Sequence, residues 1–194
     1  MALTYTPITE LQAVNVMLSV IGEQPVNTFE GTTYSEALLA RTALHTVSRA
    51  VQTEGLACNT EEDYTLNPTV DGYYLVPSNA LDINPSQRGL DVVWRGTKLY
   101  DRENHTDVFT TSSMDVDIIF FLPFESLPEA ARYYITIKAA RRFAEDTIGS
   151  VDIANFTEND EMEAQLALMR VEAKSDDRTL LDNPDIYRVV RRSF

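Results

Sequence analysis

The clearest helix signal in this chain is Leu127-Pro-Glu-Ala-Ala-Arg-Tyr-Tyr-Ile-Thr-Ile-Lys-Ala-Ala-Arg-Arg-Phe143. Just before it, Ser126 and Glu129 have the spacing of a capping box, and Pro128 falls in the first turn, where its missing N–H costs nothing. Apolar residues then recur at helical spacing until Gly149. They are Ala130, Tyr133, Ile137, Ala140, Ala144 and Ile148. The stretch therefore predicts a long helix that buries one face.

Two helices are predicted before it. Thr9 and Gln12 have capping-box spacing, and Gly22 is a natural stop for the first helix. Thr33 or Ser35 can cap a second helix that runs to about Glu54 and ends at Gly55. The predicted buried stripes are Leu11, Val14, Leu18 and Ile21 in the first helix, and Ala40, Leu44, Val47 and Val51 in the second.

A fourth helix is predicted over residues 157–174. Its apolar stripe consists of Met162, Leu166, Met169 and Ala173, which share one helical face. Past Asp177 the pattern stops, and residues 179–194, with Pro184, are expected to be extended.

Between the second and third helices the pattern changes to short β-rich runs separated by turn residues. The runs are Tyr73–Val76, Leu90–Trp94, Lys98–Tyr100 and Val116–Leu122. This spacing predicts a small antiparallel sheet or barrel, with a hairpin turn at Arg95-Gly96.

These elements together predict an α+β fold, a bundle of about four helices with an inserted β domain. The expected domains are a discontinuous helical domain of residues 1–55 and 126–176, a β domain of residues 56–125, and a C-terminal arm of residues 177–194.

Composition narrows the class of protein. The chain has 194 residues, 44% of them hydrophobic, and a formal net charge of −14, which is typical of a globular protein that does not coat DNA. No apolar run is long enough to span a membrane, and the first residues lack the pattern of a signal peptide. A single cysteine, Cys58, excludes an internal disulfide and favours folding in a reducing cytosol.

Signals for cofactor or metal chemistry are weak. The seven glycines form no nucleotide-binding motif, so no cofactor is expected. His45 is expected to be an ordinary helix residue, and His105 lies in a polar turn without the ligand spacing of a calcium loop. Cys58 has no nearby histidine in sequence, which disfavours a thiol nucleophile.

Several segments, in order, resemble the tail tubular protein A family, the head-to-tail adaptors of short-tailed bacteriophages. The first is Ala13-Val-Asn-Val-Met-Leu-Ser-Val-Ile-Gly-Glu-Gln-Pro-Val-Asn-Thr-Phe-Glu-Gly31, followed by Leu99-Tyr-Asp-Arg102 and by the helix of residues 127–143. The resemblance spans roughly residues 11–149 and implies the same architecture, helices with a β insertion.

The resemblance also implies a function. It implies a structural virion protein, made in the host cytoplasm, that forms a ring of twelve copies between the portal protein and the tail nozzle, tubular protein B. The helical layer would meet the portal, and the β insertion would face the nozzle and tail fibres. DNA would pass through the ring without sequence-specific binding, and no membrane is involved.

Paired carboxylates keep an enzymatic alternative open. Glu61, Glu62 and Asp63 adjoin one strand-like segment, and Asp115 and Asp117 share a face of another. Glycoside hydrolases use two facing carboxylates, and tail proteins of short-tailed phages meet polysaccharide. A chain with 30 acidic residues also supplies such pairs by chance, and a solvated charged face is the expected explanation.

Two charged helices are candidate assembly surfaces. The third helix carries Arg132, Lys138, Arg141 and Arg142, and the fourth is acidic, with Glu158, Glu161 and Glu163 among its acids. The basic helix of one subunit can meet the acidic helix of the next, as a head-to-tail ring requires. Pairing of the same two helices within one chain explains the charges equally well.

The C-terminal arm is the last candidate. Arginines alternate there with aromatic and aliphatic residues, unlike an ordinary frayed terminus. We expect it to dock on a neighbouring subunit or on the portal. The residues proposed for this contact are Tyr187, Arg188, Arg191, Arg192 and Phe194.

Overall fold

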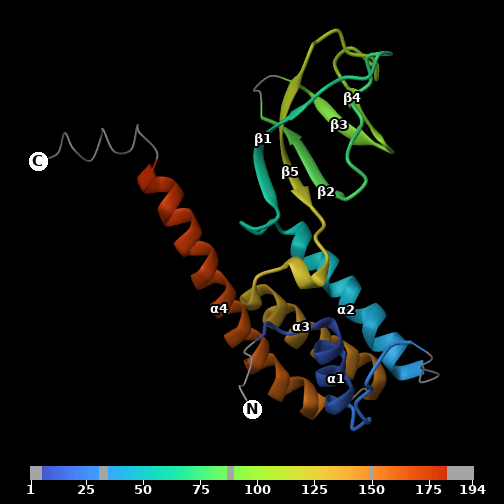
Figure 1. Ribbon diagram of the computed structural model, residues 1–194, viewed down its shortest axis with the longest axis vertical. Coiled ribbons are helices and arrows are strands. Elements are labelled where there is room, and N and C mark those ends of the chain that lie inside the picture. The colour runs from blue at the N-terminus through green and yellow to red at the C-terminus, as the bar shows by residue number, and fades with distance from the viewer. Residues whose placement is uncertain (1–5, 31–34, 87–89, 149–150, 183–194) are drawn as a thin grey trace, which may run out of the picture. The chain divides into compact units, whose positions relative to one another are not determined.

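The computed structural model describes residues 6–30, 35–86, 90–148 and 151–182, with the helical backbone alone at residues 35, 148, 151–158 and 175–182. Four α-helices, a short 3-10 helix and five strands make up this part of the chain (Figure 1). The α+β class predicted from the sequence is confirmed. The chain divides into two compact units, residues 1–49 with 123–194, and residues 50–122. Below they are called the helical unit and the β unit.

Helix α1, Glu10–Val20, begins and ends as its sequence predicts. The Thr9 side chain accepts a hydrogen bond from Gln12 N, and the Gln12 side chain accepts one from Thr9 N. Gly22 follows the last turn with a φ of +80°, a conformation that glycine adopts without strain.

Helix α2, Ser35–Thr53, also buries its predicted stripe. Ala40, Leu44, Val47 and Val51 are each at most 2% exposed.

Helix α3, Glu129–Ile148, begins differently from the prediction. The preceding residues form the 3-10 helix η1, Phe124–Ser126, and the Glu129 carboxylate accepts a hydrogen bond from Ile8 N at 2.8 Å. A distant segment of chain thus takes the place of the Ser126 capping box. Because α3 packs against both α1 and α4, its buried arc is wide and differs from the predicted stripe. Tyr133 is 43% exposed, whereas Ala131 and Ile135 are fully buried.

Helix α4, Val151–Asp182, is longer at both ends than predicted. Its predicted buried stripe is wrong, because Ala164 and Leu168 form the buried side of the helix. The stripe itself faces away from the core and is called the outer seam below. It consists of Met162 (55% exposed), Leu166 (47%), Met169 (53%) and Ala173, which is also exposed.

Five strands form two antiparallel sheets in the β unit. The larger has the order β1-β5-β2, and the smaller is the β3–β4 hairpin. The strands are β1 Thr60–Leu66, β2 Ala80–Pro85, β3 Val92–Arg95, β4 Lys98–Asp101 and β5 Met114–Phe120. The hairpin predicted at Arg95-Gly96 is confirmed, with Arg95 paired to Lys98 and Trp94 to Leu99.

Sequence patterns did not predict strands β1 and β2, and they predicted a strand at Tyr73–Val76 that the structure does not have. β1 is almost fully exposed and rich in acids, and β2 contains Asn84 and Pro85, so neither shows the apolar alternation of a strand. Conversely, Tyr73–Val76 is not a regular strand. It contacts the hairpin through a single bridge, Leu75 with Lys98, and through backbone hydrogen bonds of Tyr74 and Val76.

Buried amides close the ends of the β unit. The Gln52 side chain donates to Leu122 O at 3.0 Å and accepts from Leu122 N at 2.8 Å. Asn59 is likewise buried; it donates to Gln52 O and Phe120 O and accepts from Leu56 N. The entry and exit of this unit therefore lie side by side. Its apolar core gathers around Tyr74, Val116 and Ile118.

Candidate assembly surface

A buried arginine organises the start of α3. Arg132 is 9% exposed, and its guanidinium donates to Leu127 O at 2.7 Å, to Ile8 O at 3.0 Å and to Glu125 O. A planar guanidinium can satisfy several carbonyls at once. Of the four basic residues predicted on this helix, Arg132 thus joins segments within its own chain.

Arg141 binds the fourth helix of the same chain. Its Nε lies 2.6 Å from Glu161 Oε2, and its Nη1 lies 3.1 Å from Glu145 Oε1. The contact to Glu161 is an ion pair rather than an aligned hydrogen bond, and both atoms are sealed from solvent. This is the pairing within one chain that the charge pattern allowed as an alternative.

The other charged candidates on these helices differ in exposure. Lys138 is half-buried, with Nζ 3.1 Å from the Tyr134 hydroxyl. Arg142 and Glu163 are exposed. Glu158 is described only by its backbone, and Tyr187, Arg188, Arg191, Arg192 and Phe194 lie outside the described residues.

A third charged contact joins α1 to α2, and sequence patterns gave no direct sign of it. Glu10 Oε1 lies 2.6 Å from Arg41 Nε and 2.8 Å from His45 Nε2. Burial acts to raise the pKa of Glu10, but the hydrogen bond and charge of Arg41, assisted by His45, outweigh it and leave the pKa lowered. The bond to Glu10 in turn raises the pKa of Arg41. The available signal was the spacing of Arg41 and His45, four residues apart on one helix face.

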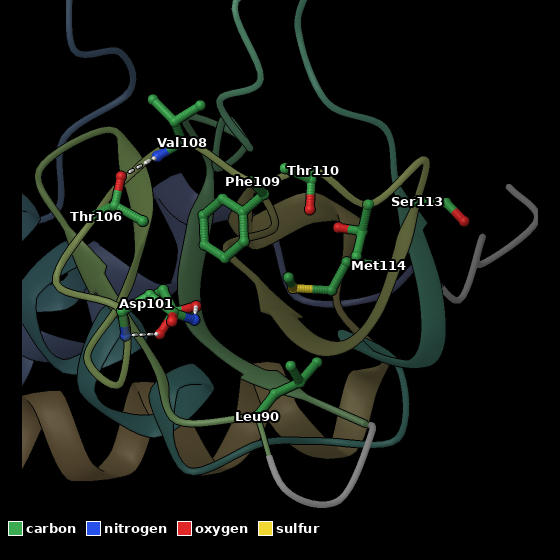
Figure 2. Close-up of a pocket in the computed structure, with 10 residues that line it drawn as sticks. Leu90, Asp101, Thr106, Val108, Phe109, Thr110, Ser113 and Met114 are labelled. Atoms are coloured by element: carbon green, nitrogen blue, oxygen red, sulfur yellow. Dashed lines mark hydrogen bonds between the residues drawn. The ribbon is translucent and has the colours of Figure 1, made fainter.

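The β unit holds a cavity of about 460 Å³ (Figure 2). Phe109 and Met114 form apolar parts of its wall, and Asp101 supplies a carboxylate. Asn104 donates to Asp101 from its side chain at 2.8 Å and from its backbone at 2.9 Å, and these bonds lower the pKa of Asp101. The wall of this cavity contains one carboxylate, whereas glycoside hydrolysis uses two.

The carboxylates proposed as catalytic pairs lie elsewhere. Asp117 accepts hydrogen bonds from Asp63 N at 3.1 Å and Ser86 Oγ at 2.8 Å, and Asp115 accepts one from Thr65 Oγ1 at 2.8 Å. Glu61 and Glu62 are exposed on β1. None of these five residues lines the cavity. Their described contacts connect neighbouring strands.

The helical unit has a smaller cavity, of about 210 Å³, beside the turn after α1. Glu23 and Glu36 line it, together with aliphatic residues and no aromatic one.

The sequence predicted no chemical role for His105 or Cys58. His105 lies in a turn with a φ of +55°, and Cys58 is exposed.

The described part of the chain contains neither a clustered set of metal ligands nor a membrane-spanning helix. No cluster of three or more His, Cys, Asp or Glu side chains able to hold a metal ion occurs there. No described helix combines the length and the apolar character needed to cross a bilayer.

Comparison with known proteins identifies the family. No curated protein matches the sequence. The family model described as "Tail tubular protein" matches residues 11–178, which includes most of both units. The chain therefore belongs to the tail tubular protein family.

Proposed function

We propose that this chain is the adaptor that joins the portal to the tail nozzle and extends the channel through which DNA leaves the capsid. The observation that carries the proposal is the family match over residues 11–178. Membership makes the chain a structural component of a phage tail. The connection to the portal, the nozzle and the tail fibres, and assembly as a ring of twelve, are the finer steps proposed here.

The chemistry of the described residues supports a mechanical role. Arg132 joins the start of α3 to the segments that precede α3 and α1, and Arg141 joins α3 to α4. The net charge of −14 repels phosphates, so a channel built from such subunits would let DNA slide without adhering to the wall.

The contacts proposed for the partners follow the sequence analysis. Arg142 and Glu163 are exposed and available to a neighbouring subunit. Residues 187–194, at the end of the C-terminal arm, are proposed to dock on the portal or on the next subunit.

Cryo-electron microscopy of the purified protein mixed with the portal of its phage tests the proposal. We expect a ring seated on the portal, with residues 188–194 ordered at a contact. Monomers that leave the portal unoccupied, under conditions in which the portal itself is intact, would overturn it.

A further inference from the structure

The helical unit has two ends, and both present an apolar face to solvent. Helix α4 packs against α3, and α3 against α1. Glu10 of α1 then binds Arg41 and His45 of α2. Helices α4 and α2 are thus the outermost members of this series, with α3 and α1 between them (Figure 1).

The face at the α4 end is the outer seam. Its four residues follow the spacing 4, 3, 4, which is the a/d pattern of a helix that packs along another helix. Leu166 is 47% exposed and Met169 is 53% exposed, although the same helix already buries Ala164 and Leu168 on its other side. Two opposite apolar faces on one helix indicate two packing partners.

The face at the α2 end is apolar in effect, although it contains threonines. Leu38 is 46% exposed and Leu39 is 60% exposed, and Thr42 and Thr46 continue the same face for two more turns. The hydroxyl of Thr42 donates to Leu38 O, and that of Thr46 donates to Thr42 O, both at 2.9 Å. Because these hydroxyl groups already donate to carbonyls of their own helix, a neighbour can cover this face without leaving a buried donor that lacks an acceptor.

The two faces are similar in extent and carry opposite charges at matching places. The seam extends over about 12 residues, or roughly 16 Å of helix, and the α2 face over about 9 residues, or roughly 12 Å. If the helices pack antiparallel, Lys174 falls opposite Glu36 of the next copy. A parallel arrangement would instead bring Glu163 toward Glu36.

We propose that the outer seam of α4 docks on the outward face of α2 of a second copy, with the two helices antiparallel. Since the two faces are different surfaces of one subunit, the contact is head-to-tail, and it repeats from copy to copy until a ring closes. This inference rests on the proposed adaptor function and names the subunit interface that the ring would use.

Disulfide trapping tests the contact. In a Cys58→Ser background, Met169→Cys and Leu39→Cys are introduced into separately tagged chains, which are mixed, assembled on the portal and oxidised mildly. We expect a disulfide between the two different tags, and a ladder of covalent multimers when one chain carries both substitutions. Met169→Cys with Val70→Cys is the matched control, because Val70 is fully exposed in the β unit, and we expect no product from that pair.

A charge exchange tests the orientation. Glu36→Lys and Lys174→Glu should each reduce assembly on the portal by roughly threefold to tenfold, and the double variant should restore it. Lys174 is exposed, and Glu36 is half-buried in the wall of the smaller cavity, so neither substitution removes a side chain of the apolar core and the single variants should fold.

The outcomes separate this inference from the adaptor proposal. Disulfides between two Met169→Cys chains would show a symmetric seam-to-seam contact and overturn the inference. So would the absence of any cross-link while the protein still occupies the portal, and this result would leave the adaptor function intact. Absence of the cross-link in the cysteine variants, together with failure of the unsubstituted protein to bind the portal, would overturn both proposals.

Discussion

Glu10 and Arg41 form a close ion pair between the first two helices, with 2.6 Å between Glu10 Oε1 and Arg41 Nε. The carboxylate is 14% exposed and the guanidinium 40% exposed. The arginine also stacks over the Phe29 ring, 4.5 Å from its centre. This relationship connects α1 and the turn after it to α2, and it makes the helical unit sensitive to acid.

Glu10→Gln should therefore lower the free energy of unfolding by about 1 kcal/mol at neutral pH, since water screens the exposed side of the pair. The pKa of Glu10 is lowered in the folded state. Its contribution is thus present above the unfolded carboxyl value of about 4.3 and is lost as pH falls through the folded value. Urea unfolding at pH 7 and pH 3 measures the difference. If Glu10→Gln lowered the free energy of unfolding by the same amount at pH 3 as at pH 7, this explanation would be contradicted.

Arg132→Ala should destabilise the protein by about 2–4 kcal/mol. The substitution removes the donor to three backbone carbonyls, those of Leu127, Ile8 and Glu125, in a buried position. Arg142→Ala, an exposed change on the same helix, is the matched control and should stay within about 0.5 kcal/mol of the parent. Thermal or chemical unfolding followed by circular dichroism compares the two. Equal effects would show that Arg132 does not hold these segments together.

Gly72→Ala should destabilise the β unit far more than Gly22→Ala destabilises the helical unit. Both glycines have a φ near +80°, so both variants bear the left-handed cost of about 1–2 kcal/mol. An added Cβ at Gly72 would also lie 2.9 Å from Phe109 O, whereas nothing lies within 4 Å at Gly22. Hydrogen exchange resolved by segment measures each unit separately. Similar losses in the two units would exclude the steric explanation.

The carboxylates of β1 and β5 should act in strand pairing rather than in catalysis. Asp117→Ala removes the acceptor for Asp63 N and Ser86 Oγ and should cost about 1–2 kcal/mol of stability. We expect the parent protein to release no reducing sugar from capsular polysaccharide of its host. Release that is abolished by Asp115→Asn or Asp117→Asn in a folded variant would instead support the glycoside hydrolase alternative.

Much of the fold was predictable where local signals and burial agree. The capping box at Thr9 and the stripe of α2 were read directly from sequence, because caps and amphipathic periodicity act within a few residues. The strands β1 and β2 were not predictable in the same way. Their pairing with β5 depends on a partner distant in sequence, and exposed acids on β1 hide the alternation.

The candidate surface was only partly predictable. The charges of α3 and α4 were visible, but sequence alone could not separate Arg141, which pairs within the chain, from Arg142, which is exposed. The apolar spacing of the outer seam was also visible. Its orientation was not, since a periodic stripe shows that a helix has an apolar face without showing what covers that face.

The two amide hydrogen bonds between Gln52 and Leu122 have a consequence for how the chain reaches its folded state. They bring the entry and exit of the β unit together, so the flanking helical segments are joined by an effective connection of only a few residues once that unit has formed. Pairing of the helical segments then requires no further loss of entropy from closing the long intervening loop. Because of the same closure, loops of the β unit can lengthen or change in sequence while the helical segments keep their pairing.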